Sequence, residues 1–144
     1  MKAVFWVAGL VLLAMTGVLQ AAERDPLQSR VPPDKIQSVK KEKNPFPATA
    51  ENIAKGKVIF NGKGTCFTCL GMEGKGDGPA AVGLDPSPRN FTNLAFQAVR
   101  TDGELMYVLK NGSPGTAMMP MVGSVVTEEE GWLVLLYVRS LGKK

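Results

Sequence analysis

Two cysteines separated by two residues, Cys66 and Cys69 in the stretch CFTCL, carry the most evident chemistry of this sequence. Thiols at this spacing can form a disulfide, cycle as a redox pair, or attach a haem covalently. In a haem attachment site, the residue after the second cysteine is a histidine that ligates the iron. Here that residue is Leu70, and the 144-residue chain contains no histidine. The motif keeps both thiols and lacks the nitrogen ligand.

A second group of sulfur-bearing side chains lies in the late loop 113–126, which contains Met118, Met119 and Met121. A methionine thioether can ligate haem iron, although methionine also commonly fills gaps in protein cores. As a group within one loop, these residues favour a site.

Three helices are expected to position these side chains, over residues 50–60, 103–110 and 128–141. Thr49 can cap the first helix, and Thr127 with Glu130 forms a capping box for the last. Gly56 inside the first helix costs about 1 kcal/mol relative to alanine, so we expect another backbone to approach there. The stretch 62–93 is rich in glycine and proline and shows no strand pattern. It predicts loops that wrap around a ligand in an all-α domain.

The N-terminal residues have the features of an export signal. Lys2 precedes an apolar run from Ala3 to Leu19, and the small residues Ala21 and Ala22 follow. We interpret residues 1–22 as a signal peptide, with an uncleaved membrane anchor as the alternative. The remainder is then expected in the periplasm or an equivalent oxidising, non-cytoplasmic lumen.

Residues 23–47 are rich in proline and charge and show no periodicity, which predicts an extended basic linker or arm ahead of a domain at 48–144. The formal net charge of the chain is only +4. Much of the excess lies in this arm, at Lys35, Lys40, Lys41 and Lys43. No nucleic-acid partner is expected. The arm is either a solvated segment or a basic element that docks on an acidic partner.

From about Asn44 to Leu141 the chain resembles the class I c-type cytochromes, the small bacterial mono-haem kind. The matching blocks, in chain order, are Gly56 and Phe60, CFTC at 66–69, GDGP at 76–79, PSPRNFT at 86–92, DGEL at 102–105, GTAMMP at 115–120, and EEEGW at 128–132 with YVRSL at 137–141. The resemblance implies three main helices with long Gly/Pro-rich loops. It also implies that the first and last helices cross, with Gly56 and Phe60 packed on Trp132 and Tyr137.

The same resemblance implies roles at the haem. Cys66 and Cys69 would bond to the haem vinyl groups, and a methionine of the late loop would ligate the iron. If a haem is bound, Met118 and Met119 are the axial candidates, with Met121 left open. Arg89 stands where the family often places a basic residue near a haem propionate. Pro79 would present its carbonyl to the ligating histidine, and it loses that role in this chain.

The missing histidine leaves three hypotheses. In the first, the domain is haem-free and the two cysteines form a disulfide. Because an empty pocket of several hundred cubic ångströms costs about 10 kcal/mol, the pocket must then be refilled. The side chains expected to refill it are Phe67, Leu70, Met72, Met118, Met119 and Met121. Such a chain would be a non-enzymatic structural, assembly or docking module of an exported respiratory redox complex, with larger subunits or another cytochrome as partners.

In the second hypothesis, the chain is an electron-transfer cytochrome whose haem is linked at Cys66 and Cys69 and whose iron lacks a histidine ligand. In the third, the two cysteines form a thiol-disulfide redox pair. That chemistry ordinarily belongs to a helix in a strand-rich βαβ setting, which the sequence lacks. The first hypothesis is the one that the sequence favours.

Overall fold

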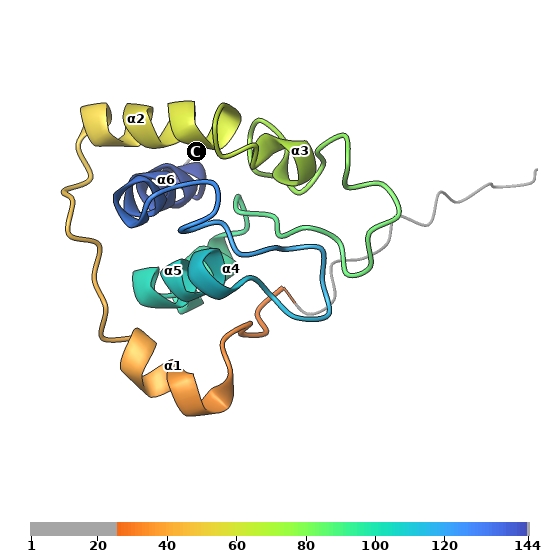
Figure 1. Ribbon diagram of the computed structural model, residues 1–144, viewed down its shortest axis with the longest axis horizontal. Helices are drawn as coiled ribbons and strands as arrows, with labels where there is room; N and C mark the ends of the chain where they lie inside the picture. The colour runs from red at the N-terminus through yellow and green to blue at the C-terminus, as the bar shows by residue number, and fades with distance from the viewer. Residues whose placement is uncertain (1–25, 144) are drawn as a thin grey trace, which may run out of the picture.

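A computed structural model describes residues 26–143 of the chain (Figure 1). The helices in this part are α1 (Pro33–Val39), α2 (Ala50–Asn61), α3 (Phe67–Leu70), α4 (Leu94–Val99), α5 (Asp102–Asn111) and α6 (Glu128–Leu141). The described residues contain no β-strand, only an isolated bridge between Val122 and Val126. The expected all-α class is confirmed. The predicted signal peptide, residues 1–22, lies outside the described residues.

The three predicted helices are α2, α5 and α6, and their ends fall at or next to the expected residues. The Thr49 side chain caps α2 by accepting a hydrogen bond from the amide of Asn52. Capping boxes begin the other two helices, Thr101 with Glu104 at α5 and Thr127 with Glu130 at α6. Within residues 26–143, no helix combines the length and apolarity that a membrane crossing requires.

Helices α2 and α6 cross at a glycine, as expected. A Cβ atom on Gly56 would clash with the backbone carbonyl of Leu133. Phe60 is fully buried beside this contact, and its ring meets that of Tyr137 edge to face with centroids 5.2 Å apart. Trp132 belongs to the same buried cluster. This crossing forms the centre of the hydrophobic core.

The N-terminal segment differs from the extended arm that was expected for residues 23–47. It contains helix α1, which has prolines before and at its first position, where a missing amide hydrogen does no harm. Helix α1 packs against α5 so closely that a Cβ on Gly103 would clash with the carbonyl of Val39. Figure 1 shows the resulting order α2, α6, α5, α1. The helix could not be predicted from apolar periodicity, because Val39 is its single buried residue.

The short helix α4 was also not predicted. Asn93 caps it by accepting from the amide of Phe96, and Phe96 is the buried residue of the helix. The Gln97 side-chain amide donates to the carbonyls of Phe91 and Val138, at 2.7 and 2.9 Å. These bonds tie the glycine-rich loop, α4 and α6 together.

Candidate functional site

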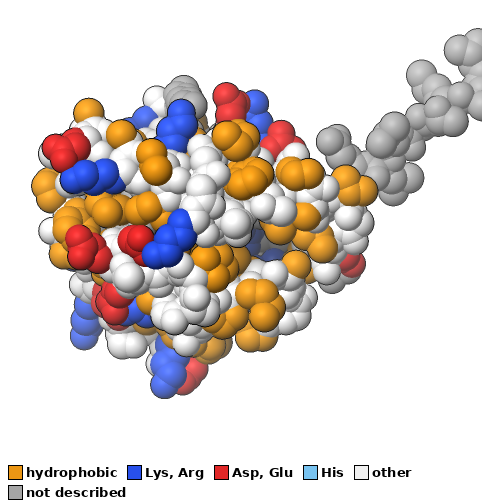
Figure 2. All heavy atoms as spheres, turned by 45° about the horizontal axis from the view of Figure 1, so that its top comes forward, with side chains coloured by type: hydrophobic (Ala, Val, Ile, Leu, Met, Phe, Trp, Pro, Cys, Tyr) orange, Lys and Arg blue, Asp and Glu red, His pale blue; other side chains and the backbone are white. Residues whose placement is uncertain are grey.

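An apolar cavity of about 380 Å³ lies among segments that are distant in the sequence. Its apolar walls come from α2, α4, α5 and α6, and include Phe60, Phe96, Leu105, Leu109, Leu135 and Val138. The CFTC turn and the methionine loop complete these walls. Figure 2 shows hydrophobic side chains over much of the visible face, interspersed with charged side chains. The loops therefore enclose a space of ligand size, as their composition suggested.

Both predicted cysteines line this cavity. Cys66 immediately precedes α3, and its amide donates to the carbonyl of Phe60 at 3.0 Å. Thr65 turns the chain at this point with a φ of 49°, in the left-handed region that β-branched residues usually avoid. Cys66 and Cys69 are free thiols, each partly buried. Burial raises the pKa of the Cys66 thiol to about 11.

That pKa limits what Cys66 can do. The thiolate is the form that attacks disulfides and binds metals, and redox-active cysteines have lowered pKa values. At neutral pH, Cys66 is almost entirely protonated. Helix α3 also follows a turn from α2 and no strand. The site is therefore unlike a thiol-disulfide redox centre.

The GDGP loop holds the CFTC turn in place. The amide of Gly78 donates to the carbonyl of Cys69 at 3.0 Å, and the amide of Gly76 donates to the carbonyl of Leu70 at 2.8 Å. A Cβ at position 78 would clash with the carbonyls of Phe67 and Thr68. The glycine at position 78 is thus required by a close approach of two backbone segments, and this approach orients the thiols.

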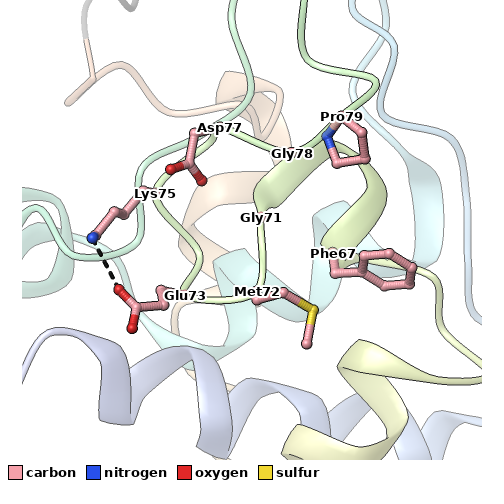
Figure 3. Close-up of a pocket in the computed structure, with 8 residues that line it drawn as sticks. All are labelled: Phe67, Gly71, Met72, Glu73, Lys75, Asp77, Gly78 and Pro79. Carbon is pink, nitrogen blue, oxygen red and sulfur yellow. Dashed lines mark ion pairs between the residues drawn. The ribbon is translucent and has the colours of Figure 1, made fainter.

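A second hollow, of about 370 Å³, lies on the other side of α3 (Figure 3). In Figure 3 an ion pair between Glu73 and Lys75, 2.9 Å long, lies to one side, and Phe67 and Pro79 lie to the other. Both charged side chains are more than half exposed, so their pairing contributes little stability. Neither cysteine lines this hollow. Phe67 and Met72 face it, and do not line the larger cavity as the refilling hypothesis expected.

The structure distinguishes the methionines of the late loop. Met118 and Met119 both border the cavity, but Met118 packs against the core whereas Met119 is 67% exposed. A turn holds Met118 in this position, because the amide of Ser113 donates to the carbonyl of Met118 at 2.9 Å. Gly112 permits the turn with a φ of 71°. Met118 is the better placed of the two axial candidates.

Leu70 also lines the cavity, and it contributes to the wall without filling the space. Its side chain has no lone pair to donate. In the described part of the chain, no three His, Cys, Asp or Glu side chains gather closely enough to hold a metal ion. The sulfur atoms that line the cavity belong to Cys66, Cys69 and the methionines of the late loop.

One part of the cavity wall is charged, and the sequence prediction largely missed it. Arg89, Arg100 and Glu104 line the cavity. The Arg100 guanidinium donates to the Glu104 carboxylate at 2.6 Å, and the Arg100 side chain is only 14% exposed. Its Nε is buried and has no hydrogen-bond partner among the described residues. Arg89 lies over the ring of Phe96, 5.3 Å from its centroid.

Glu104 is a buried carboxylate, only 2% exposed. Burial alone would raise its pKa, but the hydrogen bond from the Thr101 amide and the charge of Arg100 outweigh that effect and lower the pKa. The Thr101 hydroxyl and the Ser29 hydroxyl donate to it as well. The capping-box spacing was the one signal that could have found Glu104. Its burial depends on Ser29, which is distant in the sequence.

Comparison with solved structures finds a similar chain in the Kuenenia stuttgartiensis reducing HAO-like protein complex Kustc0457/Kustc0458. The two chains are 31% identical, with a TM-score of 0.59. The match covers 67% of this chain and 46% of the other, so this chain spans less than half of that neighbour's length. No family model matches the chain, and no curated protein matches it. The chain is thus similar in fold to part of a subunit of a multi-protein HAO-like complex.

Proposed function

We propose that this chain is a small cofactor-carrying subunit of a multi-subunit redox complex, with a class I cytochrome c-like fold and a haem linked to Cys66 and Cys69. The observation that carries the proposal is the cavity, because both thiols line a space of about 380 Å³ that the neighbouring side chains do not fill. The similarity to a chain of a reducing HAO-like complex supports the role in a larger assembly.

The size of the cavity argues that something occupies it in the working protein. At about 24 cal/mol per Å³, an uncompensated cavity of this size destabilises the fold by about 9 kcal/mol. Domains of this kind have a total stability of about 5–15 kcal/mol. A ligand or a partner's side chains would offset this cost more fully than the water that can enter from the open side.

The residues around the cavity fit an amphipathic planar ligand. Its apolar body would contact the aliphatic walls, and its acidic groups would lie near the guanidinium groups of Arg89 and Arg100, both of which line the cavity. The buried Nε of Arg100 has no hydrogen-bond partner among the described residues. Cys66 and Cys69 would tether it. These features fit a haem, whose propionates are carboxylates and whose vinyl groups bond to thiols.

The iron ligands of the family fit only in part. Met118 can supply a thioether, whereas Leu70 stands where the family has histidine and supplies nothing. The bound haem would supply one-electron transfer, and its potential would depend on its ligands and burial. The chain's own contribution is to tether the group, exclude water with its apolar walls, and balance its acidic groups.

We propose no catalytic step for the chain itself. Histidine is absent, and Glu104, a carboxylate in the cavity wall, already accepts four hydrogen bonds from Ser29, Arg100 and Thr101. A carboxylate with a lowered pKa and full hydrogen bonding is a poor proton acceptor. Electron transfer or binding within a complex suits such a site better than acid-base catalysis. The signal-like sequence at residues 1–22 supports export to the periplasm.

A haem-free docking module is the second candidate, and Leu70 in the cavity wall favours it. The intact mass and absorption spectrum of the exported chain separate the two. Cofactor carriage predicts a Soret band and a mass increase of one haem, and the double variant Cys66→Ser and Cys69→Ser should abolish the mass increase. An unmodified mass without a Soret band would reject the haem and leave the docking module. A mass lower by two hydrogens would identify the disulfide.

A further inference from the structure

One wall of the cavity comes from residues 26–31, which we call the strap. Gln28, Ser29, Arg30 and Val31 of the strap line the cavity together with residues of α5 and α6. The strap precedes α1 in the chain and has no helical or strand structure of its own. The loops 84–91 and 113–121 also line the cavity without regular structure, but the strap lies at the N-terminal end of the described residues.

Two arginines of the cavity wall hold the strap by its backbone. Arg100 donates from Nη2 to the carbonyl of Leu27 at 2.8 Å. Arg89 donates from Nη2 to the carbonyl of Gln28 at 3.4 Å. Leu27 and Gln28 are themselves exposed, so water can replace both contacts when the strap moves.

A buried carboxylate holds the strap by a side chain. The Ser29 hydroxyl donates to Oε1 of Glu104 at 3.2 Å. Val31, 5% exposed, is the buried apolar residue of the strap. Beyond it, α1 is fixed to α5 by the close contact between Val39 and Gly103. The C-terminal end of the strap is thus fixed through α1, whereas its preceding residues are held mainly by polar contacts.

We propose that the strap is a lid that detaches from Glu104, Arg100 and Arg89 to open the cavity and then closes over the ligand. The walls from α2, α5 and α6 belong to the core and would open only with global unfolding, whereas a segment with one buried apolar residue opens at a much lower free energy. The role as a ligand gate rests on the proposed function, because it requires that the cavity hold a ligand. Opening of the strap can be measured without any ligand.

Trypsin cleavage after Arg30 measures the opening. The bond between Arg30 and the buried Val31 can enter a protease only after the strap has left the wall. We expect Ser29→Ala to speed this cleavage about fivefold in the full chain, as loss of one hydrogen bond implies. Glu104→Gln should speed it further, because Arg100 loses its charged partner.

The matched control is Glu130→Gln. Glu130 occupies the same capping-box position at α6 but contacts Lys63 and not the strap. It should leave cleavage after Arg30 unchanged. Ser29→Ala leaves the α5 cap intact, so it keeps the test valid if Glu104→Gln fails to fold. Equal cleavage rates in wild type and Ser29→Ala would overturn the proposal.

Free haemin is the probe for the gate. In the full chain with Cys66→Ser and Cys69→Ser, haemin cannot be tethered, and its association rate should rise when Ser29→Ala is added. An unchanged association rate despite faster cleavage would overturn the gate. If haemin binds no variant while Ser29→Ala still speeds cleavage, the result supports the opening strap and overturns the haem assignment, so the two proposals fail separately.

Discussion

Two pairs of helices pack closely at a glycine, α2 with α6 and α1 with α5, and the two contacts differ in how many side chains they bury. Helix α6 passes so close to α2 that position 56 must be glycine, and α1 passes so close to α5 that position 103 must be glycine. At the first contact, Phe60 and Tyr137 are buried on either side. At the second, α1 buries only Val39. A glycine at a close backbone approach therefore identifies a helix contact, but it does not indicate how much that contact contributes to the stability of the fold.

The two capping boxes differ in the same way. Glu104 and Glu130 both accept from the backbone amide of the threonine that begins their helix. The Glu104 side chain is 2% exposed and that of Glu130 is 26% exposed, because the strap covers the first box and nothing comparable covers the second. We therefore expect the two capping boxes to contribute differently to the free energy of unfolding, because different segments pack over them.

The largest effect is expected at the α2–α6 contact. Gly56→Ala should lower the free energy of unfolding by about 3 kcal/mol, since Cβ would meet the backbone of a core helix that cannot move aside. At an exposed helix position, glycine to alanine stabilises instead, by about 1 kcal/mol. Urea denaturation measures the sign, and Lys57→Ala at an exposed position of α2 is the control. An increase in stability would refute the crossing.

The next effect concerns the buried capping box. Glu104→Gln should lower the free energy of unfolding by about 2 kcal/mol, because it leaves the buried Arg100 without a charged partner. Glu130→Gln should have a smaller effect, since Lys63 is 55% exposed and water can solvate it. Denaturation of both variants in one buffer gives the comparison. Equal losses of unfolding free energy in the two variants would show that the strap does not increase the contribution of Glu104 to stability.

The pH dependence of stability separates the boxes further. The folded pKa of Glu104 lies below the ordinary value of 4.5, so the stability that it contributes is complete above that value and is lost as the pH falls through the folded pKa. In wild type the unfolding free energy should fall with acidification more steeply than in Glu104→Gln. The pKa of Glu130 is lowered mainly by the hydrogen bond from Lys63. Repeating the titration in about 1 M NaCl should remove much of the Glu130 contribution and retain that of Glu104.

The smallest effect is expected at the α1–α5 contact. Gly103→Ala should lower the global free energy of unfolding by only about 1 kcal/mol, because a seven-residue helix can shift away from the added Cβ. Hydrogen exchange should reveal the local change, as faster exchange of the α1 amides with little change in α6. A loss as large as that of Gly56→Ala would place α1 within the cooperative core.

Sequence patterns predicted the parts of the fold that local signals determine. Thr49 and the Thr127–Glu130 box located the ends of α2 and α6, and Gly56 indicated the crossing. Helix α1 escaped prediction because its single buried residue, Val39, gives no periodicity. Its contact with α5 joins segments that only the folded chain brings together.

The candidate site was predictable to the same extent. The positions of Cys66 and Cys69 followed from their spacing, and both line the cavity. Spacing alone did not rank the methionines of the late loop, whereas the structure packs Met118 against the core and leaves Met119 exposed. The burial of Glu104 could not be predicted, because it involves contact with the strap, which is distant in the sequence.

The high pKa of Cys66 bears on the order of events during maturation. A protonated, partly buried sulfur reacts slowly with any electrophile that arrives after folding. Covalent modification of this residue would therefore be slower in the closed, folded chain than in the unfolded chain, where the thiol titrates normally. Alkylation of the finished protein would be slow, and a group once fastened there would be shielded from exchange for the lifetime of the fold.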